Sequence, residues 1–334
     1  MCMMQRVTSG WVIYMLLYLI SIIGGFALLV WGADRFVSGA AALATLLGVP
    51  PLIIGVTIVG FGTSAPEIMV SASAAVQELT AMAVGNALGS NIANVGLVLG
   101  VTAIIRPITA ELTGTLRVEV NLLIVLTLLT AALFVDSRLS RPEAVMLLAF
   151  FLGFMVWIVR RGLQGRQVSA AANGDNNTIP REMTMASAWL WLLIGLVVLL
   201  AGANALVWGA KYLTIRLGFS ELVIGLTIVA VGTSLPELAV SVVSAVRGRA
   251  GIAIGNIIGS NLFNLLAVVG IAGLIHPAGL DDKILWLHYP VMFAFTLALL
   301  LIAYNPFGKP GFGRGIGTLL LSGFIAYQVY VLTA

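Results

Sequence analysis

The sequence predicts an all-α polytopic membrane protein, with ten transmembrane helices in two inverted repeats of five helices each. Its composition is the first observation: 60% of the 334 residues are hydrophobic and only 9% are charged, against about 25% charged in soluble domains. The second is a series of long apolar segments, and the third is an internal repeat. A transmembrane β-barrel would instead show short strands of alternating polarity, and the sequence has no such pattern.

Ten apolar segments are each long enough, or nearly so, for the ~20 residues that cross a bilayer as a helix. The N-terminal residues 1–10 contain one basic residue and no small-residue cleavage site, so the run after them is interpreted as a first span and not as a signal peptide. The predicted spans, in order, are 11–33, 50–77, 81–105, 118–136, 142–160, 187–212, 220–246, 251–275, 284–304 and 314–333.

A polar segment divides the chain after the fifth predicted span. It begins at Arg160, is rich in Gly, Asn and Arg, and has no apolar periodicity, which is typical of a flexible linker. The sequence therefore predicts a first five-helix half over 1–160, a linker over 161–186 and a second five-helix half over 187–334.

The two halves share a repeated motif. Residues 47–101 align with residues 217–271 without a gap, at 26 identical positions of 55. The identities include Pro, Glu, Asn and Ser, which chance similarity between apolar helices rarely retains, so we interpret the motif as a duplication. With five spans in each half, the second copy enters the membrane from the opposite side. Such inverted repeats are typical of secondary transporters, which bind their substrates near the bilayer midplane between the repeats.

The charged residues favour one orientation and argue against several functions. One cysteine excludes a Cys-based metal site, and two histidines leave little room for a His-based one. With the linker inside, 11 of the 17 Lys and Arg residues lie on the cytoplasmic side, as the positive-inside rule favours. We therefore predict an inner (plasma) membrane protein with a cytoplasmic linker and both termini outside. These cytoplasmic Lys and Arg residues explain the net charge of +4, so the charge does not indicate a nucleic-acid partner.

Two glutamates are placed where an acidic residue is costly. Glu67 and Glu237 are the only two of the thirteen acidic residues that fall deep inside predicted spans. An ionised carboxylate at the bilayer centre costs at least ~2.5 kcal/mol unless it is paired, and the core of no predicted span contains Lys or Arg. The missing partner is therefore a proton or a bound cation.

A proline stands directly before each glutamate, at Pro66 and Pro236. Proline lacks an N–H, so the carbonyl four residues earlier loses its helical donor, and the residue before proline is pushed away from helical geometry. Each span is therefore predicted to break beside its carboxylate and to expose backbone oxygens there. Hard cations such as Ca²⁺ bind through six to eight oxygens of this kind.

The following spans add more polar groups. The sequences GNALGSNIAN and GNIIGSNLFN align position by position, and their glycines lie four residues apart, which permits close helix packing. Each places a polar stripe on one helix face. The two stripes are Asn86, Ser90 and Asn94 in the first copy and Asn256, Ser260 and Asn264 in the second.

These paired motifs, GTSAPE with GNALGSNIAN and GTSLPE with GNIIGSNLFN, resemble the α-repeats of the cation/calcium exchanger superfamily, which includes sodium/calcium exchangers. The resemblance covers both repeats, the ten-span plan and the central linker. It implies a secondary active antiporter, not an enzyme, that exchanges Ca²⁺ for Na⁺ by alternating access at a midplane site. It also implies that the first helix of each half slides over the remaining helices.

The same resemblance assigns ligands to the transported ions. Ca²⁺ would bind Glu67, Glu237 and the backbone oxygens of Thr63 and Thr233. Na⁺ would use the same glutamates together with four serine hydroxyls and two backbone carbonyls, and two amides would close the centre. These further residues are Ser64, Ser234, Ser90, Ser260, Gly60, Ala230, Asn94 and Asn264.

Alternatives remain open at this point. A proton-coupled Ca²⁺/cation exchanger is the nearest, and a cation channel is another. An intramembrane serine protease would need a base beside its serine, and neither histidine is near the motif in sequence. Many relatives carry Asp where this chain has Asn264, which leaves potassium coupling and ion stoichiometry undecided. We expect Ca²⁺, Na⁺ and the lipid bilayer as partners, no resident cofactor and a monomeric chain.

Overall fold

The computed structural model describes residues 2–108, 113–172, 183–216, 230–304 and 311–333, and this part of the chain is almost entirely helical. Seven of its helices are long and apolar enough to cross a membrane, or eight if the bent pair Pro51–Thr63 and Ala65–Val76 forms one span. The predicted class of an α-helical membrane protein is confirmed. Ten spans and their inversion stay predictions.

The first half contains long helices around a broken one. In chain order its elements are α1 (Cys2–Leu47), α2 (Pro51–Ile54), the π-helical turn η1 (Gly55–Val59), α3 (Gly60–Thr63), α4 (Ala65–Val76), α5 (Thr80–Ala93), η2 (Asn94–Leu99), α6 (Gly100–Ile105), α7 (Thr113–Leu133), β1 (Arg138–Leu139) and α8 (Arg141–Ala172).

The second half repeats much of this order. Its elements are α9 (Met185–Arg216), α11 (Ala230–Thr233), α12 (Leu235–Val246), α13 (Ala250–Leu262), η5 (Phe263–Val268), α14 (Val269–Ile275), β2 (Ala278–Gly279), η6 (Ile284–His288), α15 (Tyr289–Tyr304) and α16 (Arg314–Thr333). The helices α4 and α12 have the same length and begin 170 residues apart, as do α3 and α11. The strands β1 and β2 pair antiparallel.

Two helices continue past the ends that their apolar runs predict. The first predicted span ends at residue 33, yet α1 continues to Leu47. The polar pair Asp34 and Arg35 interrupts the apolar run, but both residues find partners within the protein. Asp34 forms an ion pair with Arg247, and the Arg35 guanidinium lies 4.7 Å from the ring centre of Trp191. The predicted linker over 161–186 is too long, because α8 continues as far as Ala172 and α9 begins at Met185. Arg161, the first predicted linker residue, finds its partner in Glu119 within the helical part, and residues 173–182 lie outside the described part of the chain.

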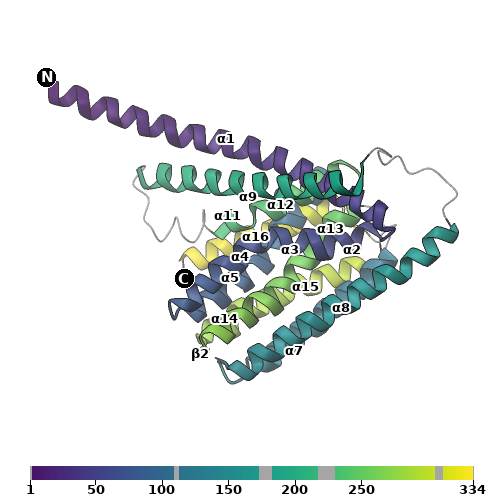
Figure 1. The fold of residues 1–334 in the computed structure, drawn as a ribbon. Coiled ribbons are helices and arrows are strands. Elements are labelled where there is room, and N and C mark those ends of the chain that lie inside the picture. The colour runs from purple at the N-terminus through teal and green to yellow at the C-terminus, as the bar shows by residue number, and fades with distance from the viewer. Residues whose placement is uncertain (1, 109–112, 173–182, 217–229, 305–310, 334) are drawn as a thin grey trace.

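The helices α1 and α9 lie side by side along one side of the molecule (Figure 1). Glycines bring their backbones into direct contact. A Cβ on Gly195 would lie 2.3 Å from the backbone nitrogen of Phe36, and one on Gly32 would lie 2.4 Å from that of Leu199. Small residues of this kind let membrane helices pack closely, so α1 and α9 form one tightly packed pair.

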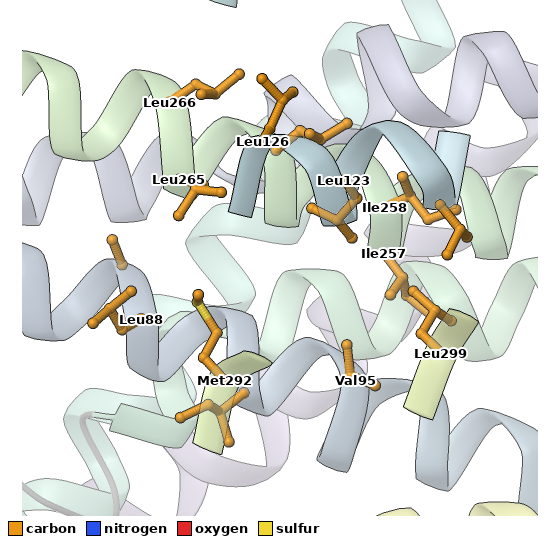
Figure 2. Close-up of a cluster of buried hydrophobic side chains, with 14 of the residues drawn as sticks. Leu88, Val95, Leu123, Leu126, Ile257, Ile258, Leu265, Leu266, Met292 and Leu299 are labelled. Carbon is orange, nitrogen blue, oxygen red and sulfur yellow. The ribbon is translucent and has the colours of Figure 1, made fainter. Parts of the chain in front are cut away.

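The core lies between this pair and the helices α7 and α8, which run along the other side in Figure 1. Figure 2 shows its buried apolar side chains converging from both halves of the chain. They include Leu88 and Val95 from the first copy of the motif, Ile258 and Leu265 from the second, and Met292 from α15. The helices that carry the repeated motif therefore form the buried centre, which positions the site described next.

Candidate cation site

The two glutamates stand where their spans break. Helix α3 ends at Thr63 and α4 begins at Ala65 with a 45° bend between the two segments, and in the second copy α11 ends at Thr233 before α12 begins at Leu235. The predicted breaks are confirmed. Proline is tolerated in the first turn of a helix because the N–H it lacks has no helical partner there. Each glutamate therefore lies in the first turn of α4 or α12, where the helix dipole favours negative charge.

Both carboxylates are buried in the middle of the protein. Glu67 and Glu237 are each 1% exposed, and they lie near enough for the charge of one to act on the other. The described part of the chain contains two salt bridges, Arg161–Glu119 and Arg247–Asp34, and neither involves these residues. Within the described chain, the pair thus has no cationic side chain to compensate it.

Hydroxyl groups from both halves surround Glu237. Thr63, Ser64 and Ser260 lie beside its carboxylate, although neither carboxylate oxygen has a hydrogen bond of standard geometry within the described chain. The Thr63 hydroxyl donates to Oδ1 of Asn256 at 2.9 Å and lies 3.3 Å from the Ser260 hydroxyl. The broken span of the first half is therefore joined to the polar stripe of the second.

Many buried oxygens at this centre lack a hydrogen-bond partner among the described residues. Leaving a buried polar group unpaired costs about 1–3 kcal/mol, and a hard cation coordinates such oxygens. These oxygen atoms are suitable ligands for a dehydrated cation. The unpaired oxygen atoms are Oε2 of Glu67, Oε1 and Oε2 of Glu237, the hydroxyls of Ser64 and Ser234, and Oδ1 of Asn91, Asn94 and Asn264.

The two central asparagines occupy π-helical turns. Asn94 is the first residue of η2 and Asn264 the second residue of η5, and both are 1% exposed. Such turns widen a helix and are frequent at functional sites. Asn94 donates from Nδ2 to Oδ1 of Asn261 at 3.1 Å, whereas both amide atoms of Asn264 lack partners in the described chain.

Asn86 and Asn256 are engaged in joining helices. Nδ2 of Asn86 donates to the Ser71 hydroxyl at 3.0 Å, and Nδ2 of Asn256 donates to the Ser241 hydroxyl at the same distance. These equivalent bonds tie α5 to α4 and α13 to α12. The close packing predicted for the motif glycines is confirmed in the second copy, where a Cβ on Gly259 would lie 2.4 Å from the carbonyl oxygen of Val56 and one on Gly255 would lie 2.5 Å from that of Leu52. The prediction is wrong for Gly85 and Gly89 of the first copy, where a Cβ would meet no described atom within 4 Å.

Most residues of the predicted ligand set are buried in the structure. The buried members are Gly60, Thr63, Ser64, Glu67, Ser90, Asn94, Ser234, Glu237, Ser260 and Asn264. Thr233 is half-buried at the end of α11, and Ala230 is the first residue of α11, although its side chain lies outside the described set. The role of each residue as an ion ligand stays a prediction.

Asn91 and Asn261 belong to the same centre, although they are not among the predicted ligands. Both are buried. Nδ2 of Asn91 donates to the backbone oxygen of Asn261 at 3.2 Å, and Asn261 also accepts from Asn94. The signal was present in the sequence, because these asparagines are identical residues at equivalent positions of the two motifs. They join α5 and η2 to α13 across the interface between the halves.

The chain is similar to known membrane exchangers over most of its length. The family described as sodium/calcium exchanger protein matches residues 17–160 and 187–333. The putative antiporter CaxA of Alkalimonas amylolytica is 44% identical over 314 residues, which cover 94% of this chain and 98% of that one. The sodium/calcium exchanger MaX1 of Methanosarcina acetivorans is 30% identical over 340 residues, covering 91% and 95% of the two chains. A solved sodium/calcium exchanger from Methanococcus jannaschii has a TM-score of 0.80 at 32% identity, with 94% and 98% coverage.

Proposed function

The chain belongs to the sodium/calcium exchanger family, and from this premise we propose that it is a secondary active antiporter that exchanges Ca²⁺ for Na⁺. Members of the family are membrane exchangers and not enzymes. One observation carries the proposal. Glu67 and Glu237 are both buried, near enough for their charges to interact, without a cationic partner in the described chain, among oxygens that lack hydrogen bonds there.

The charge of the pair explains why two cargoes exclude each other. Two carboxylates neutralise one Ca²⁺, and the neutral oxygens around them complete its shell of six to eight ligands. The same carboxylates are available to Na⁺ only after Ca²⁺ has left. Competition for one pair of charges then couples the two fluxes, provided that the site opens to one side of the membrane at a time.

As the family resemblance implies, Ca²⁺ and Na⁺ use different sets of ligands in the proposed site. Ca²⁺ binds Glu67, Glu237 and the backbone oxygens of Thr63 and Thr233. Na⁺ binds at the same glutamates with serine hydroxyls and backbone carbonyls, and the central amides close the site. This second group is Ser64, Ser234, Ser90, Ser260, Gly60, Ala230, Asn94 and Asn264.

The transport mechanism that we propose is alternating access between two inverted halves. The linker between α8 and α9 is cytoplasmic and both termini lie outside. The α1–α9 pair changes its position relative to the core and opens the site to either side. Its direct backbone contacts support movement of the two helices as one unit, and no resident cofactor or second subunit takes part.

Proton coupling is the second candidate, because the site contains two buried carboxylates that protons can neutralise. A buried carboxylate without a cationic partner is also neutralised by a proton, which binds without a coordination shell. Two buried carboxylates would then exchange one Ca²⁺ for protons instead of Na⁺.

Transport in sealed vesicles distinguishes the two. The purified protein is reconstituted into vesicles loaded with Na⁺ or with choline at equal pH, and uptake of radioactive Ca²⁺ is measured. We expect the Na⁺-loaded vesicles to take up Ca²⁺ and the choline-loaded vesicles to take up little. Uptake that ignores the Na⁺ gradient and follows an imposed pH gradient would establish proton coupling, and uptake without any counter-ion would indicate a channel.

A further inference from the structure

An apolar groove of about 550 Å³ lies between α7 and α8, away from the cation site. Its volume falls within the roughly 300–1,000 Å³ that holds small ligands. Its lining is apolar apart from one amide. The lining residues are Val118, Asn121, Leu122, Val125 and Leu126 on α7, and Ala149, Phe150, Gly153, Phe154 and Trp157 on α8.

The groove forms because the two helices that line it, α7 and α8, pack against different neighbours. Helix α7 packs against α15, and α8 packs against α14. Gly153 opens the space further, because a Cβ built there meets no atom of the described chain within 4 Å. Val125 is 56% exposed and Trp157 is 38% exposed. On the outer side of a membrane protein such surfaces face lipid, so the occupant of this groove comes from the bilayer.

Three arginines stand at the end of the groove that leads to the linker. The Arg117 guanidinium lies 4.9 Å from the ring centre of Tyr304, whose hydroxyl accepts from Nδ2 of Asn121 at 2.7 Å. Arg161 lies over Trp157 at 5.3 Å and forms an ion pair with the fully buried Glu119 at 2.7 Å. The third arginine, Arg160, is exposed.

Among the described residues, the salt bridges at this end leave two of the three arginines without an acidic partner. Glu119 compensates Arg161, whereas Arg117 and Arg160 form no salt bridge within the described chain. Nε of Arg117 is buried and has no hydrogen-bond partner there. Within the described part of the chain, the end of the groove therefore carries two arginines that no carboxylate pairs with. Arginine binds phosphate oxygens through two parallel hydrogen bonds, which makes a phosphate group the matching partner.

We propose that this groove binds one anionic phospholipid of the linker-side leaflet. An acyl chain lies between α7 and α8 against Gly153, and the phosphate contacts Arg117 and Arg160. The proposal requires only that the chain spans a membrane and does not depend on which ions it exchanges. A second copy of this chain fits less well, because a two-fold contact within one membrane brings the same surface of both copies together and so places the cationic ends beside each other.

Native mass spectrometry of the full chain, released from micelles with added lipid, tests the proposal. The probes are phosphatidylglycerol and phosphatidylcholine with identical acyl chains. We expect the wild type to retain one phosphatidylglycerol molecule in preference to phosphatidylcholine. Arg117→Gln and Arg160→Gln should each lower that retention about fivefold, since one basic residue near anionic lipid contributes about that much. Gly153→Leu should lower retention of both lipids, because it fills the groove.

Two variants serve as matched controls and should retain lipid as the wild type does. Arg138→Gln removes an exposed arginine at the opposite end of the same helices. Gly315→Leu adds a side chain at an exposed glycine of α16 whose Cβ meets no described atom within 4 Å. Equal retention of the two lipids, or retention that Gly153→Leu leaves unchanged, would overturn the proposal. A dimer that Gly153→Leu dissociates would overturn it in favour of a second copy.

Discussion

At the scale of single residues, the proposed exchange depends on the two buried carboxylates, Glu67 and Glu237. Glu67→Gln or Glu237→Gln keeps the shape of the side chain and removes its charge. An amide cannot offset the dehydration of a divalent ion, so each variant is expected to lower Ca²⁺ uptake by at least about 100-fold while the protein still purifies as a folded monodisperse species. Vesicle uptake and size-exclusion chromatography measure the two properties.

The matched control for these variants is Glu78→Gln, which removes a carboxylate from an exposed position after α4. Its uptake should equal that of the wild type. If Glu67→Gln and Glu237→Gln both transport normally, the ions bind elsewhere in the protein.

Asn94 and Asn264 determine a second property at this scale. Their amides offer oxygens to a cation but add no negative charge. A site with two carboxylates balances one Ca²⁺, and a simultaneous K⁺ would leave a positive charge uncompensated in a low-dielectric interior. Ca²⁺ uptake is therefore expected to persist undiminished when choline replaces K⁺. A strict K⁺ requirement would show that a further acidic side chain enters the site.

At the scale of elements, the contact between α1 and α9 depends on glycine. Gly195→Ala places a methyl group where the Phe36 backbone nitrogen lies only 2.3 Å away, and backbone atoms cannot move aside as a flexible side chain can. Overpacking of this kind costs about 1–3 kcal/mol, so the thermal unfolding midpoint in detergent should fall. Gly24→Ala is the control on the same helix pair, because its Cβ meets no described atom within 4 Å. Equal midpoints for the two variants would contradict the backbone contact.

At the scale of the whole molecule, the prediction concerns the orientation of the two halves. Gln77 and Arg247 are exposed residues at equivalent positions, 170 residues apart, just after α4 and α12. In an inverted repeat they lie on opposite sides of the membrane. With Cys2 replaced by serine, Gln77→Cys should react with an impermeant thiol reagent from outside and Arg247→Cys from the cytoplasmic side. Labelling of both variants from one side would exclude the inversion.

The sequence by itself determined the class of the protein and the chemistry of its centre. Composition predicted a helical membrane protein because few soluble domains carry so few charges. Pro66 and Pro236 predicted the breaks because their effect on the backbone is local, and it acts whatever surrounds it. Glu67 and Glu237 stood out because an unpaired carboxylate in an apolar span needs a counter-charge. The class follows from the composition of the whole chain, whereas the breaks and the two unpaired carboxylates follow from residues within a few positions of one another.

Only the tertiary structure decided which groups meet across large sequence separations. The first span continues past residue 33 because Asp34 and Arg35 find Arg247 and Trp191 in the second half of the chain. Asn91 belongs to the centre because it faces Asn261 across the interface between the halves. The groove between α7 and α8 follows from their packing on different neighbours. Such contacts depend on how helices pack, and a pattern along one segment does not specify the partner that covers it.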